Sequence, residues 1–193
     1  MNLRPYGDTA LLLDCESLDE AQSWFAALHD QAEAVLGART VLLRGDPGTL
    51  WSLVDQTRPA DSVALPGQPE IEVPVTYDGA DLGDVARLTG LSVDEVVEAH
   101  TGTPWTVAFG GFAPGFSYLV GGDPRLHVPR RESPRARVPA GSVGVAGEFS
   151  GVYPRQSPGG WQLVGHTELA MWDTGREPPA LLVAGMAVRF VAR

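Results

Sequence analysis

Arginine side chains are concentrated in one proline-rich segment of an otherwise acidic chain. The segment DPRLHVPRRESPRARVPAG contains Arg125, Arg130, Arg131, Arg135 and Arg137. Its prolines exclude a regular helix, because proline has no amide hydrogen and its ring clashes with the preceding turn. Two interpretations are open. The arginines pair with nearby carboxylates in a solvated loop, or their guanidinium groups bind a carboxylate or phosphate ligand through paired hydrogen bonds.

A second cluster of polar and small residues follows in the segment SGVYPRQSPGGWQLVGH. Its members are Tyr153, Arg155, Ser157, Gly159, Gly160, Gln162 and His166. Glycine permits a close approach of backbone N–H groups to a ligand, and hydroxyl, amide and imidazole groups can donate hydrogen bonds or transfer protons. The alternative is a β-hairpin whose Trp161 belongs to the core.

Three aromatic residues stand on unusually pliable backbone in the segment GGFAPGFSYL. Phe112, Phe116 and Tyr118 alternate there with glycine and proline. We expect the glycines and the proline to bend the edge of a sheet and turn the three rings toward a shared wall. That wall would be the apolar side of a pocket or of a partner interface, and the alternative is a packed corner of the fold.

The composition excludes several kinds of chemistry. All 14 basic residues are arginine, so the chain has no lysine. It therefore cannot supply the lysine of a Walker-type phosphate loop, a Schiff-base lysine, a Ser–Lys dyad or a biotin-carrying lysine. The four histidines and the single cysteine show no metal-ligand spacing, so we expect no metal site in this chain.

Charge and hydropathy exclude two classes of partner. The net charge of −10 argues against nucleic acid and against anionic membrane surfaces, because both favour proteins with an excess of basic residues. No apolar run approaches the roughly 20 residues that cross a bilayer. The apolar patch ALLL near the start is too short for a signal-peptide core, so we expect a cytoplasmic protein.

The first part of the chain alternates strand and helix patterns. Apolar runs predict strands in LRPYGDTALLLDC, RTVLLRG and IEVPVTY. A capping box at Ser17 and Glu20 predicts a helix that continues to Leu36. Asp46, followed by a proline, predicts the start of a second helix in DPGTLWSLVDQ. This order predicts a small α/β domain over residues 1–80.

The remainder, residues 81–193, has a different pattern. Two short helices are predicted in DLGDVARLTG and LSVDEVVEAHTG, the second with a capping box at Ser92 and Glu95. After Trp105 come the short apolar runs TVAFG, SVGVAG, WQLVG, ELAMW, ALLVAG and AVRFVA, separated by glycine and proline turns. Such spacing is typical of a β-barrel or β-sandwich.

The chain resembles one family in four co-linear motifs. These are GGFAPGFSYL, VPRRESPR, VPAGSVGVAG and GVYPRQSPGGWQLVGHT, and RPYGDTALLL and EVPVTYDG also fit. The family is variously called allophanate hydrolase subunit 1, Kip-type kinase inhibitor and the B subunit of 5-oxoprolinase, with a carboxyltransferase-like domain. The resemblance implies an α+β protein in which a small α/β domain precedes a cyclophilin-like closed β-barrel. Ser117 and Val120 depart from the usual motif. These departures weaken what the resemblance implies about the substrate more than what it implies about the fold.

The resemblance also implies a function. Family members described as 5-oxoprolinase act with a larger subunit and a hydantoinase-like third subunit, and open the lactam of 5-oxoproline to glutamate at the expense of ATP. The ATP can be bound by the complex rather than by this chain. On this hypothesis Arg131 and Arg135 bind a small anionic substrate, with Phe112, Phe116, Tyr118, Ser157, Gly159 and Gly160 forming the rest of the substrate site. His166, Tyr153 and Gln162 are the catalytic candidates.

Two alternatives stay open at this point. The chain could be a binding module that inhibits a sensor histidine kinase through the surface of the barrel. Allophanate hydrolysis fits less well, because amidases of that type resemble Ser–Ser–Lys enzymes and this chain has no lysine. Prolyl isomerisation is suggested by the cyclophilin-like fold alone, and a fold does not determine a function.

Overall fold

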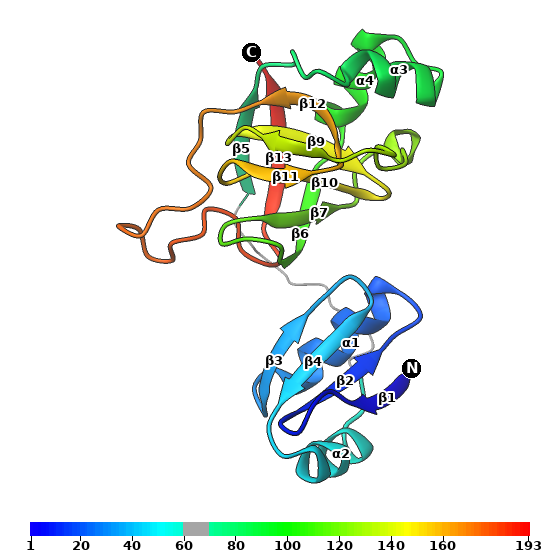
Figure 1. Cartoon of the computed structure of the whole chain (residues 1–193), viewed down its shortest axis with the longest axis vertical. Coiled ribbons are helices and arrows are strands. Elements are labelled where there is room, and N and C mark those ends of the chain that lie inside the picture. Colours follow the sequence, from blue (N-terminus) through cyan, green and yellow to red (C-terminus); the bar gives the residue numbers. More distant parts are fainter. Residues whose placement is uncertain (60–69) are drawn as a thin grey trace. The chain divides into compact units, whose positions relative to one another are not determined.

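The computed structural model describes residues 1–59 and 70–193. Contacts within the chain divide it into two compact units, Met1–Pro66 and Gly67–Arg193 (Figure 1). We call them the N-terminal unit and the barrel unit. In the described ranges, no helix has both the length and the apolar character needed to cross a membrane.

The N-terminal unit is an antiparallel sheet with two helices. The strand order is β1-β2-β4-β3. The elements are β1 (Asn2–Pro5), β2 (Ala10–Asp14), α1 (Leu18–Leu28), β3 (Glu33–Leu36), β4 (Thr40–Arg44) and α2 (Pro47–Gln56). Alternate residues of the central strands, Leu11 and Leu13 on β2 and Val41 and Leu43 on β4, are fully buried and give this unit its own core.

The two helices of this unit begin where the sequence predicts. The Ser17 hydroxyl accepts from the backbone N–H of Glu20 at 3.1 Å, and the Asp46 carboxylate accepts from Thr49 at 2.8 Å. The predicted continuation of α1 to Leu36 is wrong, because α1 ends at Leu28 and β3 follows. The end of β3 pairs with β4 across a short connection, so ladder hydrogen bonds outweigh the helical pattern of this segment.

The barrel unit consists of two short helices and a strongly curved sheet. The helices are α3 (Leu82–Thr89) and α4 (Val93–Gly102), with a 3-10 turn η1 (Pro124–Leu126). The strands are β5 (Glu70–Val75), β6 (Trp105–Gly110), β7 (Ser117–Val120), β8 (Arg135–Val138), β9 (Ser142–Ala146), β10 (Phe149–Val152), β11 (Ser157–Gly159), β12 (Gln162–His166) and β13 (Ala187–Ala192). The full capping box of α4 at Ser92 and Glu95 is confirmed.

The large sheet of this unit is a nearly closed barrel. Its strand order is β12-β9-β10-β7-β6-β13-β5, and β11 and β8 pair separately. The two ends of this order meet directly after β5, where Thr76 and His166 exchange backbone hydrogen bonds of 2.9 Å in both directions. Gly165 permits this closure, because a Cβ atom there would strike the carbonyl oxygen of Thr76. The predicted α+β class and barrel are confirmed.

The division between the two units lies earlier in the chain than residue 80. Strand β5 pairs in parallel with β13 along its whole length, from Glu70 opposite Ala187 to Val75 opposite Ala192. Figure 1 shows these strands, from distant parts of the sequence, side by side. Residues 70–80, which we expected in the first domain, therefore lie in the barrel unit.

Two of the predicted strand segments form a loop instead. ELAMW and ALLVAG lie outside the strands, and a single bridge joins Trp172 to Ala180. The Arg176 guanidinium donates to the carbonyl of Ala170 at 3.2 Å and to that of Pro179 at 2.9 Å. These carbonyl groups are thus satisfied by an arginine side chain in place of a neighbouring strand.

A buried histidine fastens α4 to the barrel. His100 is fully buried and stacks on Phe190 with a centroid separation of 4.3 Å. Its Nε2 lies 2.9 Å from the Ser150 hydroxyl, which donates onward to the Gly144 carbonyl, so Nε2 carries the hydrogen. Its Nδ1 then accepts from the Tyr77 hydroxyl at 2.7 Å. Burial lowers the pKa of His100 to about 3, so the ring is neutral.

Candidate functional site: two cavities beside an arginine–aspartate cluster

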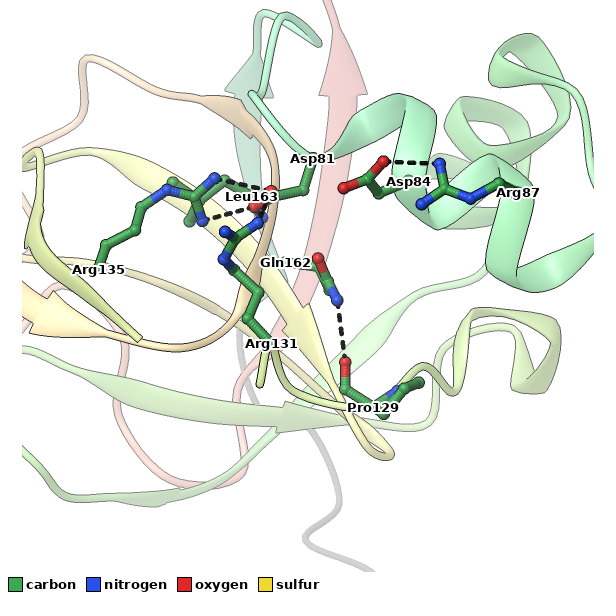
Figure 2. A network of polar contacts seen from close by, with 8 residues as sticks. All are labelled: Asp81, Asp84, Arg87, Pro129, Arg131, Arg135, Gln162 and Leu163. Carbon is green, nitrogen blue, oxygen red and sulfur yellow. Dashed lines mark hydrogen bonds and ion pairs between the residues drawn. The ribbon is translucent and has the colours of Figure 1, made fainter. Parts of the chain in front are cut away.

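A buried ion cluster lies between α3 and the arginine-rich loop. Asp81, directly before α3, is 1% exposed and accepts from Arg131 Nη1 at 2.6 Å. Arg135 binds the same carboxylate with both terminal nitrogens at 2.7 Å, and the backbone N–H of Leu163 adds a further bond of 2.7 Å (Figure 2). We call Asp81, Arg131, Arg135 and Leu163 the Asp81 cluster.

The Asp81 cluster changes the expected role of its two arginines. Arg131 and Arg135 were expected to bind the anionic substrate, but the structure places an internal carboxylate on them. Burial disfavours the charged form of Asp81, yet the hydrogen bonds from Arg135 and Leu163 and the two positive charges outweigh burial and lower its pKa. The carboxylate is therefore ionised at neutral pH, and it occupies both terminal nitrogens of Arg135 and one of Arg131.

Gln162, a predicted catalytic residue, lies beside this cluster in Figure 2. Its side chain is buried, and its Nε2 donates to the carbonyl oxygen of Pro129 at 3.2 Å. Its Oε1, like Nε of Arg131, is buried without a hydrogen-bond partner among the described residues. The contact with Pro129 ties Gln162 to the loop immediately before Arg130.

One cavity in the described part of the barrel unit is lined by aromatic rings. We call it the aromatic cavity, and its volume is about 490 Å³. Its lining residues are Phe112, Phe116, Tyr118, Pro129, Arg130, Ala146, Gly147, Phe149, Tyr153, Pro158, Gly159 and Trp161. The structure thus brings together five of the predicted site residues, from separate motifs. The size falls within the range of small-molecule sites.

The rings of this cavity contact one another mainly edge to face. Phe116 is the centre of the group, with centroid separations of 5.1 Å to Tyr118, 5.4 Å to Tyr153 and 5.4 Å to Trp161. Phe112 adds a fourth contact to Phe116 at 5.3 Å. Such contacts fix the orientation of each ring, so the wall is preorganised.

Phe112 is held in an unusual backbone conformation. Its φ of 65° lies in the left-handed region, and its side chain is 60% exposed at the mouth of the cavity. A non-glycine residue rarely adopts this conformation, and it persists only where surrounding contacts impose it. The tight turn from Gly111 to Phe116 imposes it here, through backbone hydrogen bonds of 2.7 to 3.2 Å. The turn thereby presents an apolar ring at the cavity mouth.

Arg130 is the cation of the aromatic cavity, although only Arg131 and Arg135 of the arginine-rich segment were predicted to bind the substrate. Among residues 1–59 and 70–193 its guanidinium has no carboxylate partner. The two consecutive arginines therefore lie in different surroundings: Arg130 lines the cavity, and Arg131 binds Asp81. The arginine pair was visible in the sequence, but the direction of each side chain was not.

Tyr153 and Tyr118 line the aromatic cavity together with Arg130. Burial raises the pKa of both tyrosines, and the positive charge of Arg130 partly offsets that rise in each case. Both hydroxyls are therefore protonated at neutral pH. A protonated hydroxyl can donate a hydrogen bond to a ligand.

The second cavity contains His166 and is separate from the first. We call it the His166 cavity; its volume is about 430 Å³, and it shares no lining residue with the aromatic cavity. Its lining residues are Asp78, Gly79, Ala80, Arg135, Arg137, Pro139, Ala140, Ser142, Leu163, Gly165 and His166. The His166 Nδ1 lies 2.8 Å from the Asp78 carboxylate, which leaves Nε2 for proton transfer. Sequence analysis did not select Asp78.

Ser157 and Gly160, two predicted substrate-binding residues, line neither cavity. The Ser157 hydroxyl donates to the carbonyl of Arg155 at 3.0 Å, and the carbonyl of Gly160 accepts from Arg131 N–H at 2.8 Å. They support the hairpin beside the aromatic cavity. In the described part of the chain, no group of His, Cys, Asp and Glu side chains is placed to hold a metal ion.

Known proteins resemble this chain over most of its length. The model for "Carboxyltransferase domain, subdomain C and D" matches residues 1–182. The B subunit of 5-oxoprolinase from Escherichia coli O157:H7 is 42% identical over 204 residues, which cover 96% of this chain and 93% of that protein. The protein of the same name from Bacillus subtilis (strain 168) is 49% identical over 124 residues, 63% of this chain and 52% of that protein.

A solved structure agrees with these matches. The crystal structure of TTHA0988 superposes with a TM-score of 0.79 and 34% sequence identity, and the alignment covers 100% of this chain and 40% of that one. This chain therefore corresponds to less than half of TTHA0988, and its match covers about half of the Bacillus relative. Because the family model spans nearly the whole sequence and a relative aligns over almost its full length, the chain belongs to the carboxyltransferase-domain family of subdomains C and D, together with proteins named as the B subunit of 5-oxoprolinase.

Proposed function

We propose that this chain is a subunit of an ATP-dependent lactam hydrolase that converts 5-oxoproline to glutamate. One observation carries the proposal: the 5-oxoprolinase relative from Escherichia coli is 42% identical across 96% of this chain and 93% of its own length. The name of that relative describes one subunit of a larger enzyme. For this chain we infer a larger partner subunit and a hydantoinase-like third subunit, assembled in the cytoplasm.

The two cavities support this proposal through their chemistry. 5-Oxoproline is a small ring with one carboxylate, and the aromatic cavity offers flat apolar walls and one arginine. Hydrolysis of a lactam also requires proton transfer to and from the attacking water and the leaving amine. Tyr153 is our candidate hydrogen-bond donor to a substrate in the aromatic cavity. His166, oriented by Asp78, lines the separate His166 cavity, so we assign it proton transfer to a group bound in that cavity.

The linings of the two cavities lack the usual features of a triphosphate site. The aromatic cavity has a single arginine, and the His166 cavity sets the carboxylate of Asp78 beside its arginines. A triphosphate is normally held by several cations or by a glycine-rich loop with a lysine, which this sequence lacks. We therefore propose that ATP is bound elsewhere in the complex, and that no residue of these two cavities contacts it.

The test is reconstitution of the complex from separately purified subunits. We expect ATP-dependent release of glutamate from 5-oxoproline only when this chain is present. Allophanate and urea serve as competing substrates in the same assay. Full activity in a complex that lacks this chain would contradict the proposal, as would turnover of allophanate or urea in preference to 5-oxoproline.

A further inference from the structure

Three polar side chains, Tyr118, Arg130 and Tyr153, line the aromatic cavity, and we call them its polar end. Arg130 is exposed toward solvent and has no carboxylate partner among the described residues, whereas Arg131 and Arg135 share Asp81 and Arg125 binds Asp123 at 2.6 Å. Tyr118 and Tyr153 line the same cavity as Arg130.

The remaining surface of the cavity is apolar and flat. Phe112, Phe116, Phe149 and Trp161 surround the polar end, and their edge-to-face contacts keep the rings in place. Phe112 is exposed and also strained in its backbone. Residues in such backbone conformations cluster at ligand sites, and this one places an apolar ring at the cavity.

The charge of the polar end selects the class of ligand. One guanidinium with two neutral hydroxyl donors matches one carboxylate, which accepts two parallel N–H bonds and has lone pairs left for the hydroxyls. A phosphate group would bring about two negative charges to a single cation. The walls suit a small ring, because flat faces pack on aromatic edges.

We propose that Arg130, Tyr118 and Tyr153 form a carboxylate-binding subsite at one end of the aromatic cavity, and that the cavity binds a small ring carboxylate. The identification of that ligand as 5-oxoproline rests on the proposed function. Arg130 is then the residue that determines specificity for the carboxylate. Arg131 and Arg135 fix the loop through Asp81 and do not contact the ligand.

The experiment is a calorimetric titration of the full chain with three probes. 5-Oxoproline has the ring, the lactam and the carboxylate; pyrrolidin-2-one lacks the carboxylate; cyclopentanecarboxylate lacks the lactam. We expect the two carboxylates to bind and pyrrolidin-2-one to bind about tenfold more weakly or worse, because hydrogen bonds to a charged group contribute about that factor. Equal affinity for all three probes would overturn the proposal, as would the absence of any binding.

Two variants test the assignment to Arg130. Arg130→Gln keeps a polar tip but removes the charge, and it should weaken both carboxylates about tenfold or more while leaving pyrrolidin-2-one unchanged. Arg155→Gln is the matched control, because Arg155 is exposed, lies in the same unit and lines neither cavity. Unchanged carboxylate affinity in Arg130→Gln, or an equal loss in Arg155→Gln, would overturn the proposal.

The same variant in the reconstituted complex separates this proposal from the proposed function. Glutamate formation with an unchanged KM for 5-oxoproline in Arg130→Gln would overturn the subsite and leave the function standing. Arg130-dependent binding of cyclopentanecarboxylate without any ATP-dependent glutamate formation would overturn the proposed function and leave the subsite standing. Displacement of the bound probe by the larger subunit would show that the cavity is a protein interface, which also overturns the subsite.

Discussion

The Asp81 cluster and the polar end of the aromatic cavity are two arginine sites from one loop, and they differ in what surrounds them. In the cluster, two guanidinium groups and a backbone N–H surround a carboxylate that is almost completely buried (Figure 2). At the cavity, Arg130 is exposed and has no carboxylate partner among the described residues. Adjacent residues of the same type thus support structure in one case and are available to a ligand in the other.

The roles of the residues in an arginine-rich motif must therefore be assigned one side chain at a time. A buried ion pair is strongly destabilising to break, because the remaining charge has no compensation. An exposed arginine contributes little to stability, because water and salt screen its charge. Stability and ligand binding should therefore respond to different substitutions within the same loop.

The largest expected effect is on the stability of the Asp81 cluster. Asp81→Asn should lower the free energy of unfolding of the barrel unit by about 3–5 kcal/mol, since it leaves two partly buried arginines without their carboxylate. Urea denaturation measures this loss. Asp84→Asn is the control, because the Asp84–Arg87 pair is exposed at 2.7 Å and should contribute about 0.5 kcal/mol or less. Similar losses in the two variants would contradict a structural role for the cluster.

The second effect concerns the His166 cavity. His166→Gln should lower kcat of the reconstituted complex about 100-fold, because general acid–base groups contribute at least that factor. Asp78→Asn should lower kcat less, since it alters only the orientation of the imidazole. The barrel closure should survive both substitutions, because Thr76 and His166 are joined through backbone atoms. Normal kcat in His166→Gln would remove this histidine from the reaction.

The third effect is a pH dependence of stability that comes from His100, a buried group without an ion partner. The folded pKa of His100 is lowered to about 3, below its unfolded value of roughly 6.5, so the unfolded state binds the proton more strongly. The stability due to neutral His100 is complete above pH 6.5 and is lost as the pH falls from there toward 3. Between pH 6.5 and 5 the expected loss is about 2 kcal/mol.

The pH window isolates His100 from the carboxylates. Asp81 has a lowered pKa, so its contribution is lost only below the ordinary range of an aspartate, near pH 4. Urea denaturation of the wild type and of His100→Gln at pH 6.5 and 5 gives the measurement. We expect His100→Gln to be less stable than the wild type at pH 6.5. Between pH 6.5 and 5, its free energy of unfolding should then fall by about 2 kcal/mol less than that of the wild type. An undiminished pH dependence in the variant would assign that loss to other groups.

The smallest expected effect completes the contrast with Asp81. Arg130→Gln should change the free energy of unfolding by about 0.5 kcal/mol or less, because the residue is exposed and its guanidinium has no carboxylate partner among residues 1–59 and 70–193. Urea denaturation under the conditions used for Asp81→Asn provides the comparison. A loss near that of Asp81→Asn would mean that Arg130 also has a structural partner.

Local features of the fold could be predicted from the sequence. The caps at Ser17, Asp46 and Ser92 act within a few residues, so their side-chain chemistry is legible in a single sequence. The aromatic wall was predictable for the same reason, since Phe112, Phe116 and Tyr118 belong to one short motif. The barrel followed from the spacing of apolar runs and turns.

Long-range pairings could not be predicted in the same way. Asp81 lies 50 residues before Arg131, and no local pattern marks it as the partner of that arginine. The pairing of β5 with β13 joins residues from opposite ends of the barrel unit, so β5 was assigned to the wrong domain. The division of the predicted site into two cavities has the same cause, because the direction of each side chain depends on the closed barrel.

The most direct test of the division between the two arginine sites is an amide NMR titration of the full chain with 5-oxoproline. We predict chemical-shift changes at the amides around the aromatic cavity, notably Phe112, Tyr153 and Trp161, and at the indole N–H of Trp161. The amides of Asp81, Arg135 and Leu163 should remain unchanged, because their side chains and hydrogen bonds are already committed to the Asp81 cluster. Changes confined to Asp81, Arg135 and Leu163, with none at the aromatic cavity, would contradict the assignment of the ligand to Arg130.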